Sequence, residues 1–133
     1  MAQGRIKGVN TDLKTRFLLL LLLRISQRYL IYLRQIDRIS SRTEQRLHKS
    51  MQNKELIQML GLEKSLVYFS TSLKTDEITL NKIMRGKAIK LYDEDQDLLD
   101  DVLIEIHQAI EMCNILFKYF IRNNGCICFS YFQ

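Results

Sequence analysis

The sequence contains no proline and no tryptophan, and it has only five glycines in 133 residues. Gly4, Gly8 and Gly125 lie near the ends, so only Gly61 and Gly86 interrupt the interior. A β-rich fold needs many tight turns, and turns recruit Gly, Pro, Asn and Asp. This scarcity argues against β-rich and α/β folds. Because 47% of the residues are hydrophobic and 26% are charged, the sequence predicts one all-α unit rather than a disordered chain.

No hydrophobic run is long enough to cross a bilayer. The longest run, residues 17–23, is bracketed by Arg16 and Arg24, whereas a membrane span needs about 17 to 25 mostly apolar residues. The run is not a signal peptide either, because no small-residue cleavage site follows it. Cysteine is also scarce, and three cysteines fit a reducing compartment better than a disulfide framework.

The residue clusters with which enzymes build active sites are missing from the sequence. It has no Gly-rich phosphate loop, no His/Cys ligand cluster and no Ser/His/Asp set. Its two histidines, His48 and His107, are far apart in the chain. We therefore expect neither an enzyme nor a tightly bound cofactor.

The two halves of the chain carry opposite charge. Residues 1–54 contain twelve Lys/Arg and three Asp/Glu, and residues 55–133 contain eight and twelve, so the net +5 divides into +9 and −4. The basic pI of about 9.2 does not by itself indicate nucleic-acid binding. Only Tyr29 and Tyr32 are interleaved with the arginines for base stacking. We expect no nucleic-acid partner.

The charges also recur every four residues, which places them in stripes on a helix. The basic stripe is Arg34, Arg38, Arg42 and Arg46, and the acidic stripe is Asp93, Asp97, Asp101 and Glu105. Each stripe is interpreted as a solvated face. Alternatively, the stripes contact a neighbouring chain or an anionic surface or, in the acidic case, a cation. Exposed ion pairs contribute only about 0.2 to 1 kcal/mol each, so the basic stripe would set register more than stability.

Apolar residues alternately four and three apart predict three long helices. The first seam is Leu18, Leu22, Ile25, Tyr29, Tyr32, Ile36 and Ile39. The second is Leu62, Leu66, Phe69, Leu73, Leu80 and Ile83, interrupted by Asp76. The third is Leu99, Val102, Ile106, Ala109, Cys113 and Leu116. We expect helix starts at Asn10 or Thr11, at Asn53 and near 93–97, and a stop at Gly86.

Four stretches resemble the cytosolic helices of CorA-type magnesium transporters. They are LKTRFLLLLLLRISQRYLIYLRQID (13–37), LHKSMQNKEL (47–56), ELIQMLGLEKSLVYFSTSLKTDEITLNKIMRG (55–86) and LYDEDQDLLDDVLIEIHQAIEMCNI (91–115). The string LEKSLVYFSTSL, followed by LLDDVLIE and QAIEM, is the most specific part. The resemblance covers about residues 9–115. It divides the chain into a disordered N-terminus (1–10), a CorA-like helical region (11–115) and a tail (116–133).

The resemblance implies the cytosolic part of a homopentameric plasma-membrane channel that transports Mg²⁺ or Co²⁺. In that family two long antiparallel helices precede a stalk helix, which continues into the first membrane span. The family senses Mg²⁺ through cytosolic acidic residues between subunits, and the candidates here are Asp97, Asp101 and Glu105. Mg²⁺ prefers oxygen ligands and keeps several waters. The candidates for contact with other copies or full-length subunits are Arg34, Arg38, Arg42 and Arg46.

The N-terminal α/β domain, both membrane spans and the Gly-Met-Asn pore signature of the family do not occur in these 133 residues. We therefore expect this polypeptide alone to be cytoplasmic and not to conduct magnesium. Its seams resemble half-cores meant for neighbouring helices, which predicts a weakly stable or aggregating chain. The alternative function is a free-standing helical interaction module that binds partner helices or anionic surfaces.

The tail LFKYFIRNNGCICFSYFQ (116–133) departs from the expected stalk continuation, YSNILSGTMDAFAS. Codons can be chosen for residues 116–129 that, read one nucleotide later, encode that continuation residue for residue. We therefore predict that the chain from Leu116 onward is out-of-frame translation, in which Cys126, Cys128 and the aromatic residues have no selected role. The rival interpretation is a genuine hydrophobic tail that docks on the bundle or on a membrane surface.

Overall fold

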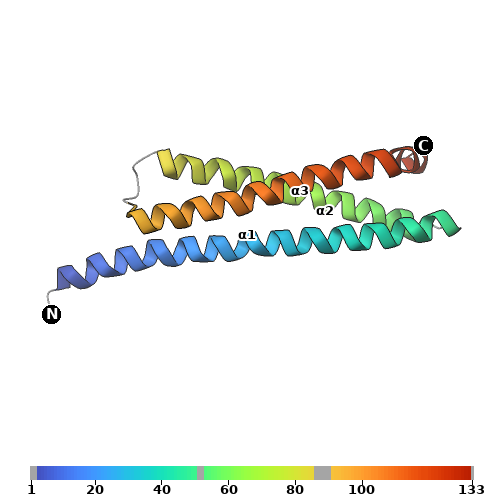
Figure 1. Ribbon diagram of the computed structural model, residues 1–133. Coiled ribbons are helices and arrows are strands. Elements are labelled where there is room, and N and C mark those ends of the chain that lie inside the picture. Colours follow the sequence, from blue (N-terminus) through green and yellow to red (C-terminus); the bar gives the residue numbers. More distant parts are fainter. Residues whose placement is uncertain (1–2, 51–52, 86–90, 133) are drawn as a thin grey trace.

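Three helices form an elongated bundle in the computed structural model. The structure describes the backbone of residues 3–50, 53–85 and 91–132, and the side chains of residues 13–49, 53–85 and 91–122. The helices are α1 (Gln3–Ser50), α2 (Asn53–Arg85) and α3 (Asp93–Phe132), and no strand occurs in the described ranges. In Figure 1, α1 and α3 run in the same direction and α2 runs antiparallel to both. The predicted all-α class is confirmed.

Most of the helix boundaries agree with the sequence. Helix α2 begins at Asn53, as predicted, and ends at Arg85, directly before the predicted stop at Gly86. Gly86 itself lies outside the described residues. Helix α3 begins at Asp93 with three acidic residues in its first turn, where negative charge offsets the positive end of the helix dipole.

The predicted start of the first helix is wrong. Helix α1 begins at Gln3, so Asn10 and Thr11 lie inside the helix and do not cap it. The division of the chain into residues 1–10, 11–115 and 116–133 stays a prediction. Once a helix is nucleated, each further residue adds one hydrogen bond, and no proline stops propagation towards the N-terminus.

Apolar side chains from all three helices make up the core. The fully buried members of this core, each 0% exposed, are Leu33, Leu66, Leu73, Leu99, Val102, Ala109 and Cys113. Burying such a Leu side chain stabilises the fold by about 1.5 to 3 kcal/mol. The third predicted seam is buried throughout. In the second seam Leu66, Leu73 and Leu80 are buried, and Asp76 points away from the core.

The predicted seam of α1 is only half right. Four of its residues remain between 38% and 47% exposed: Leu18, Ile25, Tyr32 and Ile39. The buried line lies one residue further along the helix and consists of Leu19, Ser26, Leu33, Ser40 and Leu47. The two buried serines donate hydrogen bonds of 2.8 Å to the carbonyls of Leu22 and Asp37, which satisfies their hydroxyl groups. Helix α1 therefore carries two adjacent apolar lines and buries only one.

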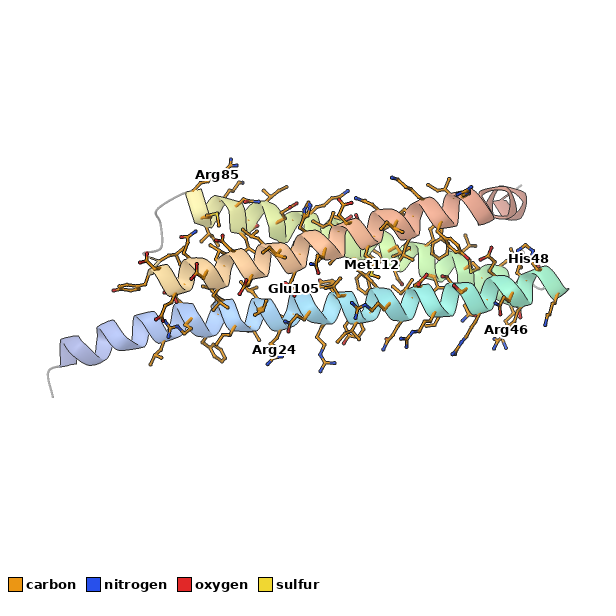
Figure 2. The ribbon with its side chains drawn as sticks, viewed as in Figure 1. Arg24, Arg46, His48, Arg85, Glu105 and Met112 are labelled. Atoms are coloured by element: carbon orange, nitrogen blue, oxygen red, sulfur yellow. The ribbon has the colours of Figure 1, made fainter. Side chains whose placement is uncertain are left out.

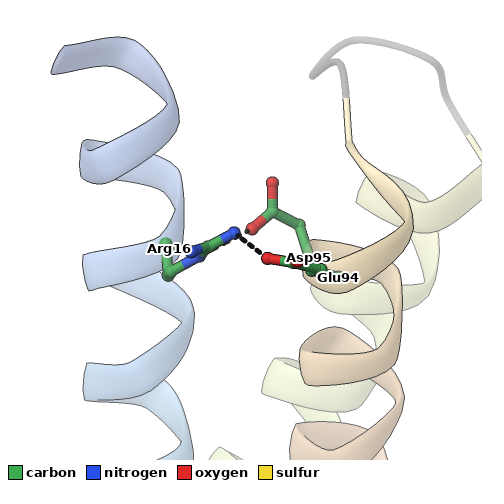
Figure 3. A network of polar contacts seen from close by, with 3 residues as sticks. All are labelled: Arg16, Glu94 and Asp95. Carbon is green, nitrogen blue, oxygen red and sulfur yellow. Dashed lines mark hydrogen bonds and ion pairs between the residues drawn. The ribbon is translucent and has the colours of Figure 1, made fainter. Parts of the chain in front are cut away.

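Polar contacts near both ends of the bundle join α1 to α3. Near the start of α3, Arg16 Nη2 lies 2.6 Å from Glu94 Oε2, and Arg16 Nε lies 3.5 Å from Asp95 Oδ1 (Figure 3). The Asp95 side chain is almost fully buried, and among the described residues Oδ1 has no hydrogen-bond donor beyond this ion pair. Towards the other end, the Tyr119 hydroxyl donates a hydrogen bond to Glu44 Oε2. These contacts hold α1 and α3 in one register.

The first residues of the predicted out-of-frame tail continue α3 and pack into the bundle. Leu116 is 4% exposed and Phe120 is 3% exposed, and both belong to the main hydrophobic cluster. This packing is what the rival interpretation of a docked tail requires for residues 116–120. Cys126 and Cys128 lie beyond the side chains that the structure describes.

Candidate functional site

An open groove lies between α1 and α2 near the middle of α1. Its volume is about 570 Å³, and it is lined by Arg24, Ile25, Arg28, Tyr29, Tyr32 and Phe69. The Phe69 ring meets Tyr29 edge-on, with centroids 5.4 Å apart, and stacks on Tyr32 with centroids 6.5 Å apart. These arrangements are the ones that aromatic pairs prefer. The groove is therefore an aromatic surface with a defined shape.

Two arginines give this apolar groove a positive border. Arg24 and Arg28 lie one helical turn apart on α1, and both are exposed. Figure 2 shows Arg24 extending from α1 on the side away from α3. A ligand that fits the groove must combine an apolar surface with negative charge, because an apolar groove with two guanidinium groups favours an acidic partner.

The exposed half of the predicted α1 seam extends this surface in both directions. Leu18, Ile25, Tyr32 and Ile39 repeat every seven residues. At 1.5 Å per residue the line is about 30 Å long. A continuous exposed apolar line of this length marks an interaction surface rather than the scattered apolar residues of an ordinary surface.

The basic stripe follows the groove's two arginines along α1. Arg34, Arg38, Arg42 and Arg46 are all exposed, and Figure 2 shows Arg46 extending from α1 into solvent. Their predicted role in partner contact stays a prediction.

The acidic stripe occupies one side of α3. Asp97 and Asp101 are exposed, whereas Glu105 is half-buried on the side that faces α1 (Figure 2). Among residues whose side chains are described, no group of three or more His, Cys, Asp or Glu is close enough to hold a metal ion. Cation sensing by these three carboxylates therefore stays a prediction. On the exposed side of α3, Ile104 is 54% exposed and lies between Asp101 and Glu105 in the sequence.

Neither histidine is isolated in three dimensions, contrary to their separation in sequence. His48 Nε2 lies 3.7 Å from Glu44 Oε1 within α1. His107 Nδ1 lies 3.5 Å from Glu77 Oε1 and so links α3 to α2. Both imidazoles are well exposed, so these contacts act as surface links between carboxylates and histidines.

Sequence reasoning missed the groove because it placed Tyr29 and Tyr32 together in a buried seam. Only the structure separates the half-buried Tyr29 from the more exposed Tyr32. One signal was available: α1 has apolar residues on two adjacent seven-residue lines, more than one seam can bury. The contribution of Phe69 from α2 depends on the packing angle of the two helices, which no sequence pattern specified.

The family model described as CorA-like Mg²⁺ transporter protein matches residues 7–119, which include most of all three helices. No curated protein and no solved structure matches the chain significantly. No helix within the described residues is both long and apolar enough to cross a membrane. The match spans the groove, both charged stripes and the core, and the chain belongs to the family of CorA-like Mg²⁺ transporter proteins.

Proposed function

We propose that this three-helix unit is the cytosolic helical part of a CorA-type Mg²⁺ transporter, where it acts as an assembly scaffold. The observation that carries the proposal is the family match over residues 7–119 together with the exposed apolar line on α1. Members of the family transport Mg²⁺ and are oligomeric, and an oligomer requires surfaces that a single chain leaves uncovered.

The core of the bundle supports a scaffolding role rather than an ion path. Its central side chains, such as Leu33, Leu66 and Leu99, are fully buried and apolar, and hydrated Mg²⁺ requires oxygen ligands and water. The exposed features lie on the outside of the bundle, where another subunit can reach them. In this proposal the helices position neighbouring subunits, and Asp97, Asp101 and Glu105 contribute at most weak, water-mediated cation contacts.

A chimaeric transporter tests the proposal. Residues 11–115 replace the corresponding cytosolic helices of a full-length CorA-type transporter, and Mg²⁺ uptake is measured in proteoliposomes. We expect the chimaera to take up Mg²⁺, and we expect the same chimaera with Leu33→Asp to lose uptake because a carboxylate enters the core. A chimaera that inserts into the membrane and assembles but takes up no Mg²⁺ would overturn the proposal.

The charge of α1 favours a second candidate function, a helical module that binds anionic surfaces. Arg34, Arg38 and Arg42 are exposed on one helix, and residues 1–54 carry a net charge of +9. Co-sedimentation of the chain with phosphatidylserine vesicles at low and high salt separates the two candidates. Binding that salt abolishes, without any association between copies, favours the module.

We propose that the gene sequence decides whether residues 116–133 are out-of-frame translation or a genuine tail. The shifted reading frame supports an out-of-frame tail from Leu116 onward, and the burial of Leu116 and Phe120 supports a genuine one. Sequencing genomic DNA from the codon of Glu111 to several hundred bases beyond the codon of Gln133 tests both. An adjacent frame that encodes two hydrophobic spans and Gly-Met-Asn supports the frameshift, and its absence supports the genuine tail.

A further inference from the structure

We propose that the groove between α1 and α2 receives the acidic face of α3 from a second copy of this chain. The inference rests on the proposed function, because it names the surface through which the scaffold assembles. The acidic face is the exposed side of α3 that carries Asp97, Asp101, Ile104 and Glu111. The two surfaces are different, so the contact is heterologous rather than two-fold symmetric.

The groove needs a partner that is both acidic and apolar. Its floor is made by Ile25, Tyr32 and Phe69, and Arg24 and Arg28 stand at its border. Ile25 is 43% exposed and Tyr32 is 46% exposed. Covering Ile25 and Tyr32 removes apolar surface from water. The two guanidinium groups lose part of their hydration, and hydrogen bonds to a carboxylate compensate for that loss.

The acidic face of α3 supplies that chemistry with matching spacing. On α1, Arg24 and Arg28 are one turn apart and Tyr32 follows one turn later; on α3, Asp97 and Asp101 are one turn apart and Ile104 follows in the next turn. At 1.5 Å per residue these runs are about 12 Å and about 10 Å long. Laid parallel, each arginine lies near an aspartate and Ile104 meets the aromatic end of the groove.

The occupant must come from another copy because α3 is already fixed in its own bundle. Its opposite side is packed into the core through Leu99, Val102 and Ile106, and Arg16 holds its first turn against α1. Asp97, Asp101 and Ile104 therefore cannot turn towards the groove of their own chain. The division of charge between the two halves, +9 and −4, makes one copy the electrostatic complement of the next.

The area also argues for contact beyond the groove itself. A stable protein interface buries about 800 Å² on each partner, which is more than one groove of this size provides. The exposed residues Leu18 and Ile39 lengthen the α1 surface on either side, and Ile115, 65% exposed, lengthens the α3 surface. A parallel contact between the two helices covers these residues together.

Disulfide trapping in the full chain tests which surfaces meet. Two differently tagged chains, both with Cys126→Ser and Cys128→Ser, carry either Arg28→Cys or Asp101→Cys and are mixed and oxidised. The buried Cys113 stays in place. We expect the mixed disulfide to exceed both like-with-like disulfides at least fivefold. Preferential pairing of Arg28→Cys chains with one another indicates a two-fold contact and would overturn the inference.

Charge reversal provides a second measurement that needs no oxidation. In sedimentation equilibrium, Arg28→Glu alone or Asp101→Arg alone is expected to weaken association about tenfold, and the double variant is expected to recover it. Lys82→Glu, an exposed charge reversal on α2, is the matched control and leaves association unchanged.

Association without rescue by the double variant overturns this contact but leaves the proposed function standing. A chain that is monomeric at every concentration overturns the contact too, whereas failure of the proposed function appears as a chimaera without Mg²⁺ uptake.

Discussion

At the level of single residues, folding lowers the chemical reactivity of a cysteine. Cys113 sits at the centre of the core with 0% of its surface exposed. Burial raises the pKa of its thiol from 9.0 to about 11, and Lys74 offsets only part of that effect. The thiolate is the reactive form of cysteine, so folding suppresses the reactivity of this side chain. Partial desolvation raises the pKa of the Asp76 carboxyl, although this side chain lies on the outer side of α2.

We therefore predict that iodoacetamide modifies Cys113 slowly in the folded chain at pH 8. The higher pKa alone lowers the thiolate fraction about 100-fold relative to the unfolded chain. As the pH rises, the thiol ionises in the unfolded chain before it does so in the folded chain. Its contribution to the free energy of unfolding is therefore fully present below about pH 9 and is lost as the pH rises towards 11. Mass spectrometry of a Cys126→Ser, Cys128→Ser chain in buffer and in urea measures the rates. Equal rates in the two conditions would show that Cys113 is not buried.

A second residue-scale prediction concerns the ion pair of Arg16 with Asp95. Arg16→Gln leaves the buried Asp95 carboxylate without its cation, and we expect a loss of about 1 to 3 kcal/mol in the free energy of unfolding. Lys14→Gln, an exposed position on the same helix, is the control and costs less than about 0.5 kcal/mol. Urea denaturation followed by circular dichroism measures both. If the two variants are equally stable, Arg16 does not hold α3 in place.

At the level of helices, sequence periodicity identified the three helices better than it identified which side of each helix faces the core. The third seam is buried in full because α3 contacts both other helices along its length. The seam of α1 was harder to predict, since the line of Leu18 is more hydrophobic than the true buried line, which includes Ser26 and Ser40. Small serines allow close helix approach, and hydrogen bonds to their own helix remove the cost of burial. Such packing depends on neighbouring helices, which a single periodic pattern does not contain.

The end of α3 gives a prediction at this scale. Phe120 is 3% exposed and its neighbour Ile121 is 68% exposed. Phe120→Ala removes a buried ring and is expected to destabilise the chain by about 3 to 5 kcal/mol, whereas Ile121→Ala has a small effect. Thermal unfolding of both variants provides the comparison. Similar unfolding temperatures would mean that residues 116–120 do not pack on the bundle, as expected for an out-of-frame segment without a structural role.

At the scale of the whole molecule, three long helices bury one good core and leave a second apolar line uncovered. The family, the elongated shape and the helix order could be inferred from the sequence, because they depend on local strings and on periodicity. The groove could not, because it arises where Tyr29 and Tyr32 on α1 meet Phe69 on α2. Both the proposed scaffold and its contact with a second copy depend on this uncovered surface.

The concentration dependence of thermal unfolding distinguishes a chain that associates through α1 from a monomer, and circular dichroism measures it on the intact chain over a hundredfold range of concentration. If copies associate through the uncovered line of α1, the folded state is stabilised by mass action and the Tm rises with concentration. Tyr32→Asp places a charge on that line and is expected to lower the Tm and remove its concentration dependence. A sharp transition of a soluble monomer, with the same Tm at every concentration, would show that copies do not associate through this line.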